Sequence, residues 1–346
     1  MYQRSMTSRE LVQRTLEFRK PVRVPRELWT LPWAEEHYPR EVARISGLYP
    51  DDIVKAPRLS RDGRDLNDPP ERYARGTYID EWGCVFENAQ SGIIGQVHKP
   101  LIRTWDDLDK LRPPEACLDL DWKAVNDFCR TQDHFVLSAA WLRPFERLQF
   151  LRSTESLMMD LAEQPDALFE LLRRVHQFYL KEAEAWARTG VDALTIMDDW
   201  GGQRSLLISP ALWRRVFKPL YQDYVTIARR YDKFVFFHSD GYISDIIPDL
   251  IEIGVNSLNA QIFCMGVENL GPKFRGRITF WGEIDRQYLL SQGSPDETAR
   301  AVRDVRRQLY ADGGVIAQCE FGAGARPENV EAVFRTWSLL DQGGKL

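Results

Sequence analysis

The chain has 346 residues, and its 46 basic and 51 acidic residues give a net charge of −5. Because no basic block accompanies this mildly acidic balance, we expect neither nucleic acid nor an anionic membrane as a partner. No apolar run approaches the roughly 18 residues of a membrane span. Five scattered cysteines without CxxC pairs are typical of reduced thiols. These features together predict a cytoplasmic protein.

Apolar, β-rich runs that stop abruptly at polar residues recur along the chain. Such continuous runs are typical of strands buried on both faces, as in a parallel sheet. The predicted strands span residues 22–29, 53–56 (the weakest of the set), 135–141, 193–197, 234–237, 257–261, 278–281 and 315–318.

Amphipathic stretches lie between these runs, and local signals mark their ends. Thr7 with Glu10 predicts a capping box at the first helix, and Ser294 with Glu297 predicts another at the helix expected over 294–310. Pro219 lies inside the helix expected over 209–231, and it should kink or divide that helix. The other expected helices span 167–188, 243–253, 294–310 and 327–340.

This alternation of about eight strands with helices predicts a single (β/α)8 TIM-type barrel over residues 1–346. A doubly wound open sheet is the rival fold. The chain has no GxGxxG after the first strand and no P-loop, so the usual nucleotide sites of that rival lack support. Residues 60–120 fit the barrel less well, and residues 78–86 alternate like a hairpin. We therefore expect an inserted hairpin or loop region there, over one barrel mouth.

Polar residues follow several predicted strands, at the face where barrel enzymes place their active sites. Asp198 and Asp199 are candidates for acid–base work or ligand binding, although aspartates at such positions also cap turns. Only one of the pair can face the barrel axis, because neighbours on a strand point oppositely. His238 ends the next strand and is a candidate acid–base group or metal ligand, with Asp240 beside it.

The later strands end in further potential ligands. Asn259 and Gln261 end one of them, and Glu283 follows the next. Cys319 lies at the end of the last strand, although a buried cysteine normally behaves as a small hydrophobic residue. His238, Glu283 and Cys319 together offer the N, O and S donors of an open zinc site.

Arginines and aromatic residues are candidate substrate contacts. Arg143, Arg147 and Arg326 have the fork geometry that matches a carboxylate, although most arginines are solvated surface. The chain also has 11 Trp, 12 Tyr and 17 Phe. Most such rings serve the core, but this abundance leaves room for a site that binds a flat apolar ligand.

Short strings of a recognisable kind are spread over nearly the whole chain. They are MTSRE (6–10), PVRVP (21–25), DEWG (80–83), FERL (145–148), DDWG (198–201), HSDG (238–241), IIPDL (246–250), GGVI (313–316) and PENV (327–330). No single string is decisive, but in their order and spacing they resemble the uroporphyrinogen decarboxylase superfamily, which includes corrinoid-linked methyltransferases. The resemblance implies a (β/α)8 barrel, often dimeric, with its pocket at the carboxyl ends of the strands.

The resemblance is closer to the methyltransferase branch than to true decarboxylases. True decarboxylases carry an N-terminal Arg-Gln-Ala-Gly-Arg element for the porphyrinogen carboxylates, and only Arg26 remains of it here. The methyltransferase branch binds zinc through His-x-Cys and a later Cys. His238 and Cys319 stand at matching positions, while Asp240 replaces the first Cys. Asp240 or Glu283 would therefore complete the ligand set.

The leading hypothesis is a zinc-assisted methyltransferase that moves a methyl group between a small substrate, such as a methoxylated aromatic, and a corrinoid protein. The corrinoid would sit on a partner chain, because the chain has no Asp-x-His-x-x-Gly motif. Asp198 or Asp199 would orient the substrate or move a proton. We expect a homodimer. The expected substrate contacts are Trp29, Trp141, Arg143, Trp200, Gln203 and Gln261.

The sequence is also compatible with two other functions. A metal-free decarboxylase or lyase would act on a carboxylated ring, with Asp198 or Asp199 stabilising cationic character and arginines holding carboxylates. A non-catalytic ligand-binding barrel is the third class, and the density of polar groups at the strand ends argues against it. The fold alone does not choose among them.

Overall fold

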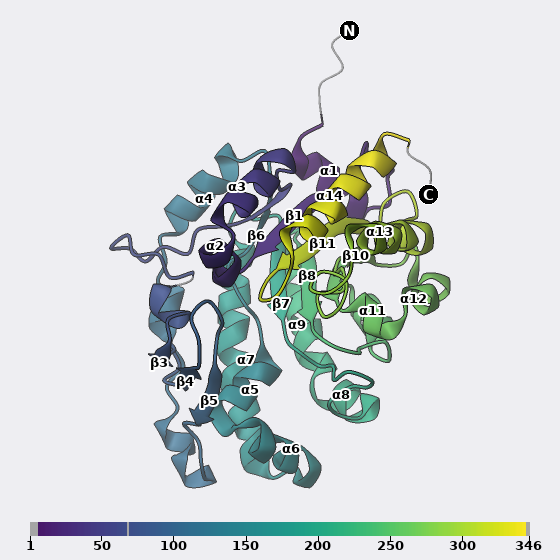
Figure 1. Ribbon diagram of the computed structural model, residues 1–346. Helices are drawn as coiled ribbons and strands as arrows, with labels where there is room; N and C mark the ends of the chain where they lie inside the picture. Colours follow the sequence, from purple (N-terminus) through teal and green to yellow (C-terminus); the bar gives the residue numbers. More distant parts are fainter. Residues whose placement is uncertain (1–5, 68, 344–346) are drawn as a thin grey trace.

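The computed structural model describes residues 6–67 and 69–343. Its main sheet has eight parallel strands in the order β1-β11-β10-β9-β8-β7-β6-β2, surrounded by helices (Figure 1). This confirms the predicted (β/α)8 barrel. The strands are β1 (Arg26–Thr30), β2 (Ile53–Lys55), β6 (Phe135–Leu137), β7 (Ala193–Met197), β8 (Phe234–Ser239), β9 (Ser257–Ala260), β10 (Thr279–Trp281) and β11 (Val315–Phe321).

Asp51 and Asp52, directly before β2, join β2 to β1, the two ends of this strand order. The backbone N–H of Asp52 donates to the carbonyl oxygen of Arg26, and the Asp52 carboxylate accepts from the Arg26 N–H, both at 2.8 Å. The Asp51 carboxylate accepts from the N–H of Leu28 at 2.8 Å. Arg23 also donates to both oxygens of Asp52, at 2.6 and 2.7 Å. The two aspartates therefore close the barrel where the ladder is incomplete.

The helix-end signals of the sequence are present. Both capping boxes form, at Thr7 with Glu10 and at Ser294 with Glu297. Pro219 lies in the first turn of α9, so the expected long helix is divided. The helices are α1 (Ser8–Leu16), α2 (Pro32–His37), α3 (Pro39–Leu48), α4 (Trp122–Thr131), α5 (Pro144–Arg152), α6 (Thr154–Glu163), α7 (Asp166–Ala187), α8 (Pro210–Val216), α9 (Lys218–Arg230), α10 (Ile247–Ile253), α11 (Ile262–Met265), α12 (Val267–Phe274), α13 (Pro295–Leu309) and α14 (Pro327–Asp341).

Two predicted elements begin later than expected, in both cases near a proline. The first strand begins at Arg26 instead of residue 22, directly after Pro25, which has no N–H for a ladder. Helix α10 begins at Ile247 instead of residue 243, because Pro248 suits the first turn of a helix.

The hydrophobic core has two layers, separated by the barrel wall. Inside the barrel, Phe135, Phe236, Trp281 and Ile316 pack with residues of α1. The outer layer lies between strands and helices and includes Ala317, Cys319 and Phe321 of β11. Because neighbours on a strand point oppositely, Gln318 and Glu320 face the barrel interior with Ile316.

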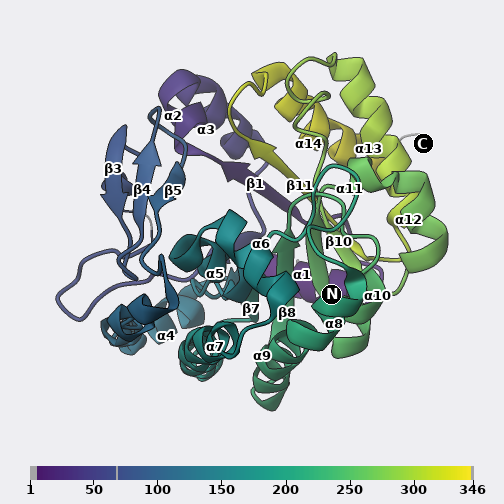
Figure 2. The same ribbon diagram turned by 90° about the horizontal axis from the view of Figure 1, so that it is seen from below.

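The predicted insertion forms a small antiparallel sheet beside the barrel (Figure 2). Its strands are β3 (Gly76–Ile79), β4 (Val85–Asn88) and β5 (Gln96–Lys99), and Tyr78 pairs with Phe86 as the hairpin prediction requires. Three short 3-10 helices flank it, η1 (Pro70–Arg72), η2 (Trp105–Lys110) and η3 (Glu115–Leu118). Among the described residues, no helix is long and apolar enough to cross a membrane.

Candidate active site

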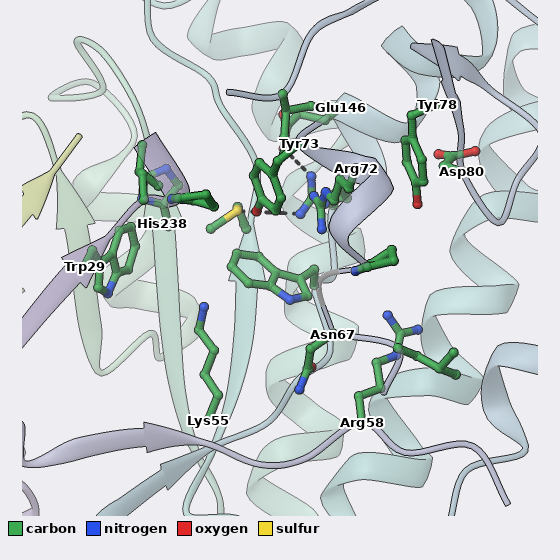
Figure 3. Close-up of a pocket in the computed structure, with 18 of the residues that line it drawn as sticks. Trp29, Lys55, Arg58, Asn67, Arg72, Tyr73, Tyr78, Asp80, Glu146 and His238 are labelled. Carbon is green, nitrogen blue, oxygen red and sulfur yellow. Dashed lines mark hydrogen bonds and ion pairs between the residues drawn. The ribbon is translucent and has the colours of Figure 1, made fainter. Parts of the chain in front are cut away.

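A cavity of about 1310 Å³ opens between the carboxyl ends of the strands and the insertion. Ligand pockets commonly measure about 300–1,000 Å³, so this one has room for a substrate and a second reactant. Figure 3 shows side chains from both parts of the fold pointing into it. The barrel end is lined by Trp29, Lys55, Trp141, Arg143 and His238, and the insertion end by Arg58, Arg72, Tyr78, Asp80 and Arg147.

His238 stands on β8 with both ring nitrogens engaged. Its Nδ1 lies 2.6 Å from Oδ1 of Asn259, whose amide nitrogen donates to the carbonyl oxygen of Trp281. Because this second bond orients the Asn259 amide, Nδ1 of His238 carries a proton and donates it. Its Nε2 then faces Oδ1 of Asp199 at 3.4 Å and Oδ1 of Asp240 at 3.7 Å.

The surroundings of His238 control its charge. Burial by itself would lower the pKa of this imidazole, but the hydrogen bond and charge of Asp199, with the charge of Asp240, outweigh burial and raise the pKa to about 9. The pKa of Asp199 is lowered, because the neighbouring imidazolium overcomes the effect of burial. Without a metal, a buried imidazolium therefore lies beside the partly exposed carboxylates of Asp199 and Asp240.

Asp199, His238 and Asp240 form the one group among the described residues whose ligand atoms suit a metal, all within 4.8 Å of one another. Oδ1 of Asp240 is buried and has no hydrogen-bond partner in the described part of the chain. Arg286 binds the other oxygen of Asp240, and Asn259 orients His238. Ligands about 2.1 Å from a tetrahedral zinc ion lie about 3.4 Å apart, so these donors fit zinc.

Two of the expected zinc ligands lie outside this group. Cys319 packs in the outer layer against the helices, and burial raises the pKa of its thiol well above the usual value. Glu283 is buried, with its carboxylate 3.4 Å from Arg286, and burial raises its pKa to about 8. The fold therefore groups His238 with the carboxylates of Asp199 and Asp240, in place of Glu283 and Cys319.

Asp198 faces away from the cavity and caps α5. Its carboxylate accepts from the backbone N–H groups of Phe145 at 2.9 Å and Glu146 at 2.7 Å, and from the Tyr221 hydroxyl at 2.6 Å. Burial and the charge of Glu146 raise the pKa of Asp198 well above its usual value. Only Asp199 of the pair faces His238, as the alternation of side chains predicts.

Three expected substrate contacts line the cavity. The Trp29 ring lies 5.5 Å from the His238 ring, measured between centroids. The Trp141 ring has the Lys55 ammonium 4.3 Å and the Arg143 guanidinium 5.4 Å from its centroid. A flat, electron-rich or anionic substrate would find apolar faces and positive charge side by side here.

The other expected contacts lie elsewhere. Trp200 is fully buried, stacked on Phe145 at 3.9 Å, and its indole N–H donates to Tyr221. Gln203 is exposed on the loop after β7, and Gln261 occupies the N-cap position of α11 without a side-chain capping hydrogen bond. None of these three expected contacts is among the residues that line the cavity.

The two remaining arginine candidates are also accounted for. Arg147 lines the insertion end but is buried in an ion pair with Asp80, so it anchors the insertion to α5. Arg326 is exposed at the start of α14.

Several site residues carry no recognisable signal in the sequence. Arg286 contacts the carboxylates of Asp240, Glu283 and Glu320, which come from three different strand ends. Glu146 lines the cavity from the first turn of α5. Glu146 belongs to the FERL string, but glutamates are common in the first turn of helices, so the string by itself does not indicate a site residue.

Comparison with known proteins places the chain in a family. Residues 78–338, well over half of the chain, match the model of the uroporphyrinogen decarboxylase (URO-D) family. The chain therefore belongs to this family, as the sequence strings indicated. A search of curated proteins found no significant match.

Solved structures support the fold. A methyltransferase from Methanosarcina mazei is similar with a TM-score of 0.65 and 17% identity, covering 97% of this chain and 99% of that chain. A glycosylated endo-beta-1,4-xylanase from Gloeophyllum trabeum is more distant, with a TM-score of 0.44 and 11% identity, covering 96% of this chain and 98% of that chain. The first likeness shows a shared barrel fold, and the second carries no argument.

Proposed function

We propose that this URO-D family barrel transfers a methyl group between a small substrate and a corrinoid carried by a partner protein. One observation carries the proposal, the buried Oδ1 of Asp240 that faces Nε2 of His238 without a hydrogen-bond donor. A buried acceptor without a donor is costly, and a metal ion would satisfy it. The likeness to a methyltransferase supports the reaction type.

Zinc is the metal that we propose for Asp199, His238 and Asp240. One nitrogen and two oxygen ligands leave a fourth position for a substrate atom. The chemistry that zinc supplies in such a site is Lewis-acid polarisation of a heteroatom. Without thiolates the donor set is hard, which favours an oxygen or nitrogen atom over the sulfur of a thiol substrate.

The chain's own residues would hold the substrate and keep the ligands in place. The Trp29 and Trp141 rings offer faces for a flat substrate, such as a methoxylated aromatic. Arg143 places a positive charge beside it. Arg286 fixes the Asp240 carboxylate and Asn259 fixes the His238 ring. The cavity is open, which leaves room for the corrinoid of a partner, and the expected homodimer stays a prediction.

Metal analysis tests the site directly. Protein purified without chelator should contain about one zinc per chain, measured by mass spectrometry. His238→Ala and Asp240→Ala should lose it, because each removes a donor. Cys319→Ala is the matched control and should keep its zinc, because this thiol faces the helices. Zinc that survives His238→Ala, or leaves with Cys319→Ala, would contradict this ligand set.

Methyl transfer is tested with methyl phenyl ether and methyl 4-cyanophenyl ether as donors and free cob(I)alamin as acceptor. We expect methylcobalamin to form with zinc-loaded wild-type protein and not with His238→Ala. No transfer from any donor, with zinc bound, would contradict the proposed reaction.

Decarboxylation of a carboxylated substrate is the second candidate, and the positive charge around the cavity favours it. Two of these cations already have a carboxylate partner within the protein, since Arg147 pairs with Asp80 and Arg58 pairs with Glu182. Arg143 is positioned to meet a carboxylate. Release of carbon dioxide from uroporphyrinogen, with no methyl transfer, would favour this function over the first.

A further inference from the structure

We propose that Glu146 is a catalytic residue that gives a proton to the substrate heteroatom as its methyl group departs. This inference rests on the proposed methyl transfer. Nothing in the chain's resemblance to its family assigns a role to Glu146, which is a residue of the FERL string.

The position of Glu146 is fixed by its backbone. It lies in the first turn of α5, and its N–H donates to Oδ1 of Asp198 at 2.7 Å. Asp198 directly follows β7 and directly precedes Asp199 of the proposed metal site. The helix cap therefore ties Glu146 to the strand end that carries a metal ligand.

The Glu146 carboxyl group is largely buried, and one of its oxygens lacks a hydrogen-bond partner among the described residues. It lines the same cavity as His238 and Trp141, with 16% of the side chain exposed. Its Oε2 is buried and accepts no hydrogen bond from the described residues. Arg143 Nη1 lies 3.7 Å from Oε2, too far for a hydrogen bond. A buried carboxyl oxygen in this state gains by holding a proton or by meeting a ligand that donates one.

Burial and the charges around Glu146 bring the pKa of its carboxyl group close to neutral pH. Burial raises its pKa to about 7, Arg143 opposes that rise, and the charge of Asp199 adds to it. The charges of His238 and Arg147 also lower the pKa of Glu146, and Asp198 accepts a hydrogen bond from its backbone N–H. A general acid works best when its pKa lies close to the working pH.

The reduced corrinoid supplies the electron pair for the new bond to the methyl carbon, and the bond between carbon and heteroatom breaks. Its electrons stay on the heteroatom, which takes the Glu146 proton and leaves as a neutral alcohol or phenol. Glu146 is left as a carboxylate, stabilised by Arg143, and regains its proton from solvent. A strongly basic phenoxide leaving group needs this proton, whereas a weakly basic phenoxide, such as 4-cyanophenoxide, needs it less.

Two donors separate this role from a structural one. In Glu146→Gln, transfer from methyl phenyl ether should fall about 100-fold, while transfer from methyl 4-cyanophenyl ether should fall by less than about 10-fold, because its phenoxide is a weaker base. Among aryl ethers, the variant should depend more steeply on the pKa of the departing phenol than wild type. Glu155→Gln is the matched control, because Glu155 is an exposed glutamate in the first turn of the next helix.

A spectroscopic measurement checks the proton without any turnover. Metal-free wild-type protein should show an infrared carboxylic acid band that titrates near pH 7 and is missing from Glu146→Gln. Equal loss with both donors, or identical infrared titrations, would overturn the role of Glu146. Wild-type protein that transfers from neither donor contradicts the proposed function itself, and the role falls with it.

Discussion

At the scale of single residues, the charge on His238 governs how the site responds to pH. The imidazole is buried, and two carboxylates face its Nε2. In the metal-free protein, burial opposes its protonation, but Asp199 and Asp240 raise the pKa to about 9, above the ordinary value of 6.5. Protonated His238 therefore stabilises the folded state.

The sign of this effect sets a testable pH window. A pKa raised on folding adds stability that is complete below about pH 6.5 and is lost as the pH rises to about 9, amounting to about 3 kcal/mol. His238→Gln should not lose stability in this way over the same pH range. Urea denaturation of metal-free wild type and variant at pH 6 and pH 9.5 measures the difference. Parallel pH dependences in the two proteins would contradict the charged imidazole.

At the scale of elements, the cap of α5 couples fold and site. Asp198 receives two backbone N–H groups of this helix and the hydroxyl of Tyr221 on α9. It thereby joins the end of β7 to two helices, one of which carries Glu146 and the other Tyr221.

Asp198→Ala should therefore destabilise the fold by about 2–4 kcal/mol, because three buried donors lose their acceptor. Thr7→Ala, which removes the side-chain cap of α1, is the control and should cost about 1 kcal/mol. Chemical denaturation of both variants measures the two costs. A loss at Asp198 no greater than that at Thr7 would show that the cap does not join these elements.

At the scale of the whole molecule, closure of the barrel depends on the join between β1 and β2. Asp52 is 1% exposed and accepts from Arg23, from the Arg26 N–H and from the Ser8 hydroxyl. These partners come from the first turn of α1, from β1 and from the segment that leads into β1. One buried carboxylate thus holds three parts of the barrel base.

Asp52→Ala should lower the free energy of unfolding by about 3–5 kcal/mol, since the Arg23 guanidinium, the Arg26 N–H and the Ser8 hydroxyl all lose one shared, buried acceptor. The control is Asp62→Ala, which breaks an exposed ion pair with Arg64 and should cost about 0–1 kcal/mol. Thermal unfolding followed by circular dichroism compares them. Equal melting temperatures for the two variants would contradict closure through Asp52.

Local signals in the sequence predicted much of the architecture. The strand runs, the capping boxes at Thr7 and Ser294, the break at Pro219 and the hairpin near Tyr78 all depend on neighbouring residues. The polar strand ends also indicated where the cavity opens. Such features are readable because hydrogen bonds of caps and the alternation of side chains act over a few residues.

The composition of the site depended on which way each side chain points. Cys319 and Glu320 are neighbours on β11, yet the thiol meets the helices and the carboxylate meets Arg286. Asp198 and Asp199 divide in the same way. A shift of one residue in strand register exchanges the two faces, so a list of polar residues at strand ends does not identify the ligands.

The sequence by itself determined the barrel, the insertion, the face that holds the cavity and the family. Only the tertiary structure decided that Asp199, His238 and Asp240 meet, that Arg286 gathers carboxylates from three strand ends, and that Glu146 enters the cavity. The physical reason is the separation along the chain of the residues that determine each feature. Periodicity and caps are set by adjacent residues, whereas a site is set by how distant strands close around one axis and by the charges that burial then brings together.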